Sequence, residues 1–472
     1  MIRLLNAYFP RRVLFLGISE GCLIALSFVA AATVRLGTND ATLMLQYEQG
    51  FLKILILSGA FLICMYYFDL YDSSILSNQR EVFTRLVQAL GSMCILVAVI
   101  YYFYPPLELG RGIILIGLTM VAITLVLWRG LFSALNRRPR FAERTMIFGD
   151  EPSASRLLRE LESRPELGLS VVGRVLVDGN GIYEMNCERR SRTGTSDGAI
   201  TREELPAAIG LQRVNRIIVS LDERRGRLPV EVLLSMKSRG VYVQDGFEFY
   251  EQITGKLPIE SLRLGTLLFS SGFRVSRFLV IYKRASSIVV SIIGLVLCLP
   301  FLPFVALAIK LTSPGRLLYH QKRVGRNGTV FYCHKFRTMR ADAEADTGPT
   351  WAGDEDPRIT SVGRFLRTTR LDEIPQLWNV LRGEMSLVGP RPERPEFVEW
   401  LQKEIPHFHL RHTVRPGISG WAQIRYKYGS SVEDAKEKLR YDLFYVKHLS
   451  PGLDVLIFFQ TVKIILLGRG AR

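Results

Sequence analysis

The feature that most constrains this chain is a series of long apolar runs in its first third. There are four of them, at residues 13–34, 50–68, 87–104 and 112–129. Each approaches the roughly 20 apolar residues with which a helix crosses a bilayer, where every backbone polar group must be bonded within the protein. The loops after the first and third runs hold only Arg35 and Arg111 as basic residues, whereas basic residues are frequent before the first run and after the fourth. By the positive-inside rule we expect residues 1–135 to form a four-helix transmembrane bundle with both ends on the cytoplasmic face.

Charge and cysteine usage narrow the class of protein further. The net charge is +17, so we expect an anionic partner, which could be a membrane surface, a nucleic acid or a phosphorylated substrate. The six cysteines include no CxxC pair, which indicates neither a disulfide framework nor a zinc site. We expect no cleavable signal peptide, because the first apolar run has no persuasive cleavage site and further runs follow. Glu20 is the one charge inside that run, and we expect it to snorkel or to face a neighbouring helix.

Residues 136–272 read as an α/β domain. "RTMIFGD" predicts a short strand and a turn, "SASRLLRELES" a helix, and "VNRIIVSL" and "VYVQ" further strands, a pattern typical of a Rossmann-like unit. The first turn, Gly149-Asp150-Glu151-Pro152, departs from GxGxxG, and its acids would repel a pyrophosphate. We therefore expect a degenerate, structural or regulatory domain, with binding of a nucleotide or coenzyme A as the alternative. The basic stretch 188–198 is expected to be a solvated loop.

A fifth apolar stretch, residues 286–309, is long enough to span a bilayer but carries two prolines past its middle. Basic residues flank it on both sides, so a spanning helix would send one basic cluster to the outer face. A helix that breaks at Pro300 or Pro303 and returns keeps both clusters at the anionic cytoplasmic surface. We therefore expect a re-entrant helix, with a proline-kinked span as the alternative.

The stretch "RLDEIPQLWNVLRGEMSLVGPRP", residues 370–392, places two adjacent acids before an apolar helix. Pro375 lacks an N–H, so the helix can begin only a few residues earlier, which makes Asp372 a candidate N-cap with Glu373 favoured at the positive end of the helix dipole. The helix should end near Gly383. Capping is compatible with a chemical role, because a helix N-terminus keeps a carboxylate ionised and presents N–H groups to an incoming phosphate.

Other candidates have simpler explanations. "HFHLRH" offers three histidines, but its neighbours favour a surface turn, and "GRNGT" is typical of a hairpin turn. Trp421 and Tyr445 could contact a sugar or a lipid headgroup, or could belong to the core or anchor the domain at the interface. The C-terminal "LDVLIFFQTVKIILLGRGAR" is typical of a helix on a membrane surface with a basic end.

From residue 280 onward the chain resembles the bacterial sugar transferases that move a hexose 1-phosphate from a nucleotide sugar to polyprenyl phosphate. The resemblance rests on "YHQKRVGRNGTVFYCHKFRTM", "DPRITSVGRFLRTTRLDEIPQLWNVLRGEMSLVGPRP", "VRPGISGWAQI" and "YDLFYVKHLS", which occur in this order. Four apolar runs, a Rossmann-like middle and "FYEQITGKLPIESL" resemble the long form of the family, which initiates exopolysaccharide or O-antigen synthesis. The implied architecture is a transmembrane bundle, a middle α/β domain and, over residues 273–472, an α-rich monotopic catalytic domain at the cytoplasmic face of the bacterial inner membrane.

The resemblance also implies roles for individual residues. Asp372 would be the nucleophile, and Glu373 would help to hold a divalent cation, normally Mg²⁺. Pro300 matches the helix-breaking proline by its spacing to Lys310, but Leu299 stands where many relatives have serine, so Pro300 and Pro303 both remain candidates for the break. Substrate phosphates would be bound by the basic residues of the motifs, which are Lys335, Arg337, Arg391 and Arg415, and Arg367 would be a further phosphate or structural contact.

The implied reaction is transfer of a hexose 1-phosphate from a UDP-sugar to undecaprenyl phosphate, with release of UMP through a phospho-sugar aspartate. A carboxylate can attack phosphorus, and such a transfer needs a cation and basic groups around the phosphates. The alternatives are a glycosyltransferase that releases UDP and a non-catalytic, nucleotide-sensing adaptor of a polysaccharide assembly complex. Expected partners are the UDP-sugar, undecaprenyl phosphate and membrane lipids, with a homodimer compatible with the sequence and nucleic acid the weakest candidate. No motif distinguishes glucose, galactose and N-acetylated hexoses.

Overall fold

The computed structural model divides the chain into two compact units, one formed mainly by Phe9–Phe249 and the other mainly by Tyr250–Arg472. Within them the structure describes residues 2–4, 7–76, 78–136, 142–177, 183–187, 198–201, 203–221, 227–260, 272–273, 276–340, 356–426, 429 and 431–467. Most of the basic stretch at 188–198 and the basic end after 467 lie outside the described residues. The domain limits at 135/136 and 272/273 stay predictions.

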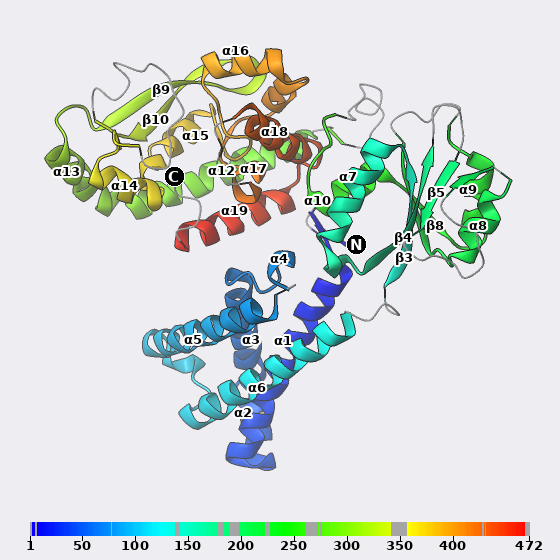
Figure 1. Ribbon diagram of the computed structural model, residues 1–472. Helices are drawn as coiled ribbons and strands as arrows, with labels where there is room; N and C mark the ends of the chain where they lie inside the picture. Colours follow the sequence, from blue (N-terminus) through cyan, green and yellow to red (C-terminus); the bar gives the residue numbers. More distant parts are fainter. Residues whose placement is uncertain are drawn as a thin grey trace. The chain divides into compact units, whose positions relative to one another are not determined.

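The four long apolar runs are helices. A small sheet of β1 (Ile2–Leu4) and β2 (Ala7–Phe9) comes first in the chain, and its residues Arg3–Tyr8 belong to the second unit. The first unit contains α1 (Arg11–Leu36), α2 (Thr38–Tyr47), α3 (Gly50–Tyr67), α4 (Ser73–Leu76), α5 (Gln79–Phe103), η1 (Pro105–Leu107) and α6 (Arg111–Asn136). α1 packs against α3 and α6, and α3 packs against α5 (Figure 1). Phe28 and Phe61 are central to the shared core, while many other apolar side chains stay exposed, as expected for a surface that faces lipid. The helices are long and apolar enough to cross a membrane, which is consistent with the predicted membrane part, and their crossing as a four-helix bundle stays a prediction.

Glu20 faces a neighbouring helix, one of the two expected outcomes. Its carboxylate accepts hydrogen bonds from Arg129 Nε at 2.7 Å and Nη2 at 3.1 Å, and from the Tyr71 hydroxyl at 2.7 Å. The remaining Arg129 nitrogen donates to the carbonyl of Leu70 at 3.1 Å. Glu20 is 0 % and Arg129 7 % exposed, so this ion pair joins α1 to α6 inside the helical core.

The second part of this unit is an α/β layer, as predicted. Its elements are β3 (Glu143–Gly149), α7 (Glu151–Glu162), η3 (Pro165–Leu167), β4 (Leu169–Val177), β5 (Tyr183–Cys187), β6 (Gly198–Ile200), α8 (Leu205–Leu211), β7 (Arg216–Ser220), α9 (Val230–Ser238) and β8 (Tyr242–Asp245). The sheet order is β6-β5-β4-β3-β7-β8, with β4, β3, β7 and β8 parallel and β5 and β6 antiparallel additions. α7 covers one face and α8 and α9 the other (Figure 1).

The carboxyl ends of β3 and β7, where such a sheet usually binds nucleotides, are closed. A Cβ atom on Gly149 would lie 2.2 Å from the carbonyl oxygen of Ser220, and the N–H of Asp150 donates to that oxygen at 3.3 Å. The Asp150 carboxylate accepts from the N–H of Ser153 at 3.3 Å and so caps α7, occupying the helix end that a pyrophosphate would use. This closure favours the structural or regulatory alternative over nucleotide binding.

The second unit holds the motifs. The limit between the units, Phe249/Tyr250, falls inside α10 (Gly246–Thr254). The second unit then contains α12 (Arg277–Cys298), η4 (Leu299–Phe301), α13 (Leu302–Thr312), β9 (Leu318–Val324), η5 (Arg326–Gly328), β10 (Val330–Phe336), α14 (Ser361–Thr368), η6 (Leu371–Glu373), α15 (Gln376–Arg382), β11 (Ser386–Val388), α16 (Pro395–Glu404), η7 (Phe408–Thr413), β12 (Gly417–Ser419), α17 (Trp421–Arg425), α18 (Val432–Lys447) and α19 (Pro451–Leu466). β9 and β10 form an antiparallel hairpin across the predicted Asn-Gly turn, with Asn327 at φ 54°.

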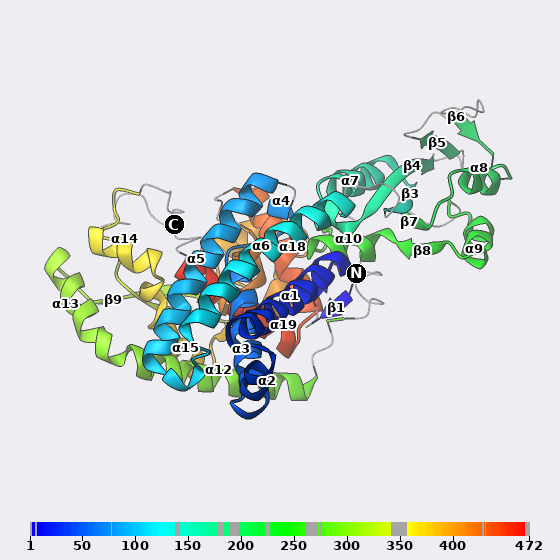
Figure 2. The same cartoon turned by 90° about the horizontal axis from the view of Figure 1, so that it is seen from below.

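The apolar stretch before the hairpin bends where its prolines lie. α12 ends at Cys298, the 3₁₀ turn η4 contains Pro300, and Pro303 lies in the first turn of α13. Figure 2 shows α12 and α13 meeting at an angle. The irregular turn coincides with Pro300, as the spacing to Lys310 implied. Arg277–Thr312 is also long and apolar enough to cross a bilayer, and its re-entry stays a prediction.

The segment at residues 250–260, at the start of the second unit, packs against the C-terminal part of the same unit. Glu251 is buried and pairs with both Lys447 and His448 at the end of α18. The Trp421 indole donates to the carbonyl of Gly255 at 2.9 Å and stacks on Phe444. The segment around 250–260, which fitted the long form in sequence, is therefore an integral part of this unit.

Candidate functional site

The acid pair lies in the turn before its helix and does not cap it. Asp372 and Glu373 belong to the 3₁₀ turn η6, which follows Arg370 in the left-handed conformation (φ 55°). Pro375 takes the N-cap position of α15, with no side-chain cap, so the prediction that Asp372 caps this helix is wrong. The physical reason is the extra turn, which moves both carboxylates ahead of the helix end. The predicted stop at Gly383 is confirmed, with φ 89° at that residue.

Glu373 is surrounded by three cations. Its Oε1 accepts from Arg391 at 2.8 Å and from Lys335 at 3.1 Å, and its Oε2 lies 3.5 Å from Arg370. Burial alone would raise the pKa of this carboxyl, but Arg391, Lys335 and Arg370 hold it well below its usual value. The side chain is therefore an ionised carboxylate, 6 % exposed, that gathers the cations of three separate motifs.

The pKa of Asp372 is shifted in the opposite direction from that of Glu373. Asp372 is 8 % exposed, and burial, together with the adjacent Glu373, raises its pKa, while Lys335, Arg391 and Arg367 lower it. Two neighbouring carboxylates thus have pKa values displaced in opposite directions. Such divergence marks sites where titratable groups have different tasks.

Arg367 belongs to the same cluster of charges. It lies on α14, its Nε donates to the Thr338 hydroxyl at 3.0 Å, and its guanidinium interacts electrostatically with Asp372. Burial lowers the pKa of Arg367, and Asp372 opposes that shift. The structure therefore brings together Lys335, Arg367 and Arg391 with the acid pair, and their contact with a phosphate stays a prediction.

The other two predicted phosphate contacts have different surroundings. Arg337 donates to the carbonyls of Ser313 and Pro314 at 2.7 and 2.8 Å, which fastens the end of α13 to the hairpin. Arg415 lines a separate cavity with Arg284 and Arg326, and neither acid of the pair lines that cavity. For both residues direct contact with the reacting phosphate stays a prediction.

Asn379 links the helix after the acid pair to the strand that carries Lys335, and sequence reasoning missed it. Its Oδ1 accepts from the N–H of His334 at 3.1 Å, and its Nδ2 donates to the carbonyl of Tyr332 at 2.7 Å. These bonds hold α15 against β10, the strand that carries Lys335. The available signal was a polar residue inside an otherwise apolar helical stretch, since a fully buried amide needs bonded partners.

The GPRP loop that carries Arg391 is fixed through its backbone. Arg411 donates to the carbonyl of Arg391 at 2.9 Å, and Arg323 donates to the carbonyl of Pro392 at 2.8 Å. Arg411 is in turn paired at 2.8 Å with Asp442, whose burial raises its pKa to about 6 against the opposing effect of Arg411. A Cβ atom on Gly389 would lie 2.4 Å from the carbonyl oxygen of Arg415, so the close approach of this loop requires glycine.

An apolar cavity of about 160 Å³ opens beside Glu373. Arg370 and Glu373 contribute charge to its lining, and the rest is mainly aliphatic, with Ile374, Leu377, Ile418, Ile424 and Ile464. Part of the wall comes from α19, the helix predicted to lie on a membrane surface. The cavity can therefore take an apolar chain whose charged end reaches the cation cluster.

The remaining sequence candidates have structural roles. Trp421 is 2 % exposed, and the Tyr445 hydroxyl donates to Asp454 at 2.7 Å inside the same core, so the core alternative is confirmed for both. The histidines of "HFHLRH" lie at the 3₁₀ segment η7, in agreement with a turn. Within the described part of the chain, no group of three or more His, Cys, Asp or Glu side chains is placed to hold a metal ion.

That finding is compatible with the expected Mg²⁺. This ion is commonly held by one or two carboxylates together with substrate phosphates and water. Asp372 and Glu373 supply two adjacent carboxylates of this kind, and the cations that now neutralise Glu373 could turn to the phosphates. The donor set therefore fits a magnesium site that the substrate completes.

Comparisons with known proteins identify similar sequences. The sequence profile of a family described as "Bacterial sugar transferase" matches residues 278–468. A UDP-N-acetylgalactosamine-undecaprenyl-phosphate N-acetylgalactosaminephosphotransferase from Aeromonas hydrophila is 43% identical over 225 residues, which are 47% of this chain and 52% of the relative, so the match spans about half of that protein's length. A UDP-glucose:undecaprenyl-phosphate glucose-1-phosphate transferase from Xanthomonas campestris pv. campestris is 30% identical over 369 residues, 74% of this chain and 72% of the relative. An "Exopolysaccharide production protein PSS" from Rhizobium leguminosarum bv. phaseoli is 44% identical over 187 residues, 39% of this chain and 94% of the relative.

Proposed function

Since this chain belongs to the bacterial sugar transferase family, in its long form, we propose that it transfers a hexose 1-phosphate from a UDP-sugar to undecaprenyl phosphate and so initiates a polysaccharide repeat unit. The observation that carries the proposal is the acid pair of Asp372 and Glu373, gathered with Lys335, Arg391 and Arg367 beside an apolar cavity. This combination suits a phosphorylated substrate attached to an apolar chain.

In the first half-reaction a carboxylate oxygen of Asp372 attacks the sugar-bearing phosphorus. The new Asp–O–P bond forms as the bond to the UMP oxygen breaks, and UMP leaves. Lys335 and Arg391 stand where they can stabilise the charge on the transferring phosphate, and such preorganised charge is a large contribution to catalysis. Glu373 holds these two cations in place before substrate binds.

In the second half-reaction an oxygen of undecaprenyl phosphate attacks the same phosphorus. The Asp–O–P bond breaks, Asp372 is regenerated as a carboxylate, and the product is a sugar diphosphate lipid. The aliphatic cavity beside Glu373 suits the first isoprene units of this acceptor, because its charged end lies at the cation cluster. A single site thereby serves both substrates in turn.

Mg²⁺ would be held by Glu373 together with the substrate phosphates. It would neutralise the diphosphate of the donor and the departing UMP. Lys335 and Arg391 contribute positive charge from the protein side, and their release from Glu373 would accompany substrate binding.

A membrane location is supported by the four long apolar helices of the first unit and by the apolar Arg277–Thr312 segment, which are long enough to cross a bilayer. We assign it to the inner membrane with the motifs on the cytoplasmic face, where UDP-sugars are present, because the basic flanks of the apolar runs obey the positive-inside rule in that orientation.

The test is the identity of the nucleotide product. The purified full-length protein, incubated with Mg²⁺ and each of several UDP-sugars in the absence of acceptor, should release UMP up to one equivalent of enzyme and then stop. Addition of undecaprenyl phosphate should restart the release and yield a lipid-linked sugar diphosphate. UDP as the product would show that the protein is a glycosyltransferase that transfers only the sugar. If no donor led to nucleotide release, the non-catalytic adaptor would be the remaining alternative.

The electrostatics of the acid pair predict a pH dependence. The attack requires ionised Asp372, whose pKa is raised by burial, so kcat/KM should fall as pH decreases through that pKa. Lys335 lowers the pKa of Asp372, so Lys335→Gln should raise it further and move the acid limb of the profile to higher pH. The pH dependence of UMP release in wild type and variant measures the shift.

Lys322→Gln is the matched control, because Lys322 is exposed on the same hairpin. Its acid limb should coincide with that of wild type. An acid limb for Lys335→Gln that is unchanged or moves to lower pH would contradict the assignment of Asp372 as the titrating group.

A further inference from the structure

A second, smaller cavity in the catalytic unit has a strongly cationic lining. It measures about 60 Å³ and is lined by Val280, Lys283, Arg284, Ser287, Arg326, Met385, Ser386, Thr413, Val414, Arg415 and Leu449. Four of these side chains are basic, three carry hydroxyl groups and none is acidic. This composition is that of a site for an anion with apolar attachments.

Three of the four cations are not neutralised within the described part of the chain. Lys283 is paired with Asp454 at 2.6 Å, but Arg284 donates only to the carbonyls of Val380 and Leu381, at 2.5 and 2.6 Å. Arg326 and Arg415 have no carboxylate partner among the described residues. Burial lowers the pKa of Arg415, and repulsion from Arg284 and Arg326 adds to that effect. An anion between these guanidinium groups would remove the repulsion.

The cavity is distinct from the acid pair. Arg284 binds the last carbonyls of α15, and Gly383, at φ 89°, leaves room for its guanidinium there. Asp372 and Glu373 precede the other end of this helix. Seven residues of α-helix rise about 10 Å, so a helix length separates the two groups of cations.

The position of the cavity along α12 indicates the source of the anion. Lys283 and Arg284 are the last charges before an uncharged stretch that runs to Ile309. The cavity therefore lies where this helix changes from basic to apolar, which is the level of lipid phosphates in a membrane. Val280 and Met385 line the same cavity and suit the apolar attachment of such a phosphate.

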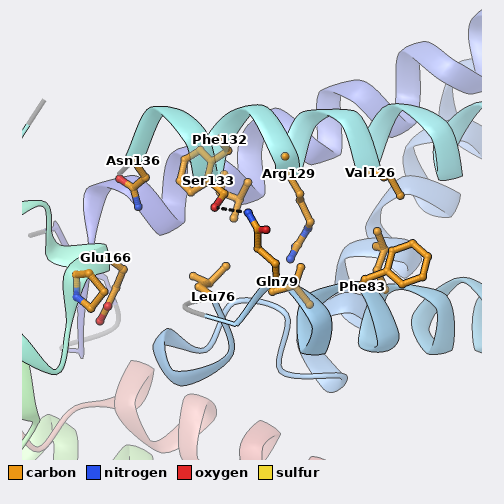
Figure 3. A pocket seen from close by; sticks show the side chains of 14 residues that line it. Leu76, Gln79, Phe83, Val126, Arg129, Phe132, Ser133, Asn136 and Glu166 are labelled. Carbon is orange, nitrogen blue, oxygen red and sulfur yellow. Dashed lines mark hydrogen bonds between the residues drawn. The ribbon is translucent and has the colours of Figure 1, made fainter. Parts of the chain in front are cut away.

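The larger cavity in the first unit lacks this combination. It measures about 370 Å³ and lies between α5 and α6 (Figure 3), where Gln79 donates to the Ser133 hydroxyl at 3.2 Å. Its one basic side chain, Arg129, is already paired with Glu20. The small cavity differs from the larger one because three of its basic side chains have no carboxylate partner among the described residues.

We propose that the cavity formed by Arg284, Arg326 and Arg415 binds the phosphate of an anionic membrane lipid, as a site separate from the acid pair. The guanidinium groups bind the phosphate oxygens, and the hydroxyls of Ser386 and Thr413 add further hydrogen bonds. The lipid's chains follow α12 into the bilayer. The site anchors the catalytic unit at the membrane surface and does not depend on the reaction proposed above.

The experiment measures lipid binding to the detergent-solubilised full-length protein by native mass spectrometry. The probes are dioctanoyl phosphatidic acid and dioctanoyl phosphatidylcholine, with inorganic phosphate and UDP as competitors. We expect wild type to bind phosphatidic acid the more tightly, Arg326→Gln to weaken that binding about tenfold, and Arg326→Gln/Arg415→Gln to weaken it further, because charge-assisted bonds are lost. Inorganic phosphate and UDP should not displace the lipid.

Lys403→Gln is the control, since it removes one exposed charge on α16, away from the cavity lining. The proposal would be overturned if all variants bound phosphatidic acid with the affinity of wild type, or if Lys403→Gln weakened binding as much as Arg326→Gln. It would also be overturned if wild type bound phosphatidylcholine as tightly as phosphatidic acid. Displacement by inorganic phosphate would show a site for any small anion, and displacement by UDP alone would assign the cavity to the nucleotide donor. Arg326 is exposed and its side chain makes no bond within the described structure, so its replacement should leave the thermal unfolding midpoint unchanged and keep the test interpretable.

Discussion

Replacement of Asp372 by Asn should abolish transfer while the protein stays folded. An amide cannot form the phospho-sugar intermediate, and loss of a covalent nucleophile typically costs at least about 1,000-fold in kcat, or ~4 kcal/mol of barrier. Burial raises the pKa of Asp372, so the folded state bears a cost for its charge, and Asn should leave the unfolding midpoint unchanged or higher. The measurements are UMP release, thermal unfolding and the intact mass after incubation with donor alone.

Intact mass separates a nucleophile from a residue that only binds. Wild type incubated with a UDP-hexose and no acceptor should gain the mass of a phosphohexosyl group, and Asp372→Asn should gain none. Glu399→Gln, which neutralises an exposed acid on α16, should behave as wild type in every assay. An Asp372→Asn variant that still acquired the adduct would assign the covalent step to another side chain.

Local patterns in the sequence predicted those features that depend on neighbouring residues. The four apolar runs became α1, α3, α5 and α6, because their length and composition suffice for helices in lipid. The Asn-Gly turn of the hairpin and the helix end at Gly383 followed from backbone conformations that these residues favour. The proline-containing break after Cys298 is of the same kind.

Features that depend on distant partners were not predictable in this way. The turn that holds the acid pair begins after Arg370, and Glu373 in that turn pairs with the distant Lys335 and Arg391, whereas local rules favoured Asp372 as a cap. Arg411 supports the GPRP loop from a position 20 residues further along the chain, and its pairing with Asp442 exists only in the folded unit. Closure of the nucleotide end of the sheet likewise needs β3 beside β7.

The charges within the motifs were predicted as a set, but their arrangement was not. The resemblance implied that Lys335, Arg367 and Arg391 serve the same phosphate, and the structure gathers them around the acid pair. Arg415 came from the same reasoning and lies instead with Arg326 and Arg284. The order of motifs in a sequence does not give the distance between them in the fold. From the sequence, two groups of cations that lie about one helix length apart are therefore predicted as a single group.

The second large effect concerns stability and should be seen with Glu20→Ala. This change leaves Arg129 buried in the helical core without its carboxylate, and an uncompensated buried charge typically costs ~3–5 kcal/mol. The unfolding midpoint in detergent should therefore fall strongly. Glu48→Ala, which removes an exposed acid after α2, should leave it nearly unchanged.

The double variant Glu20→Leu/Arg129→Met distinguishes the cost of a broken pair from the value of the intact pair. Apolar side chains of similar volume remove both charges and fill the same space, so the double variant should recover most of the stability that Glu20→Ala loses. Tyr71 then loses one acceptor, which limits the recovery, because a hydroxyl left unbonded in the core costs about 1–3 kcal/mol. A double variant as unstable as Glu20→Ala would mean that the ion pair itself, through its two bonds between α1 and α6, holds the helices in register. Recovery would mean that the intact pair adds little to the stability of these helices beyond what apolar packing supplies.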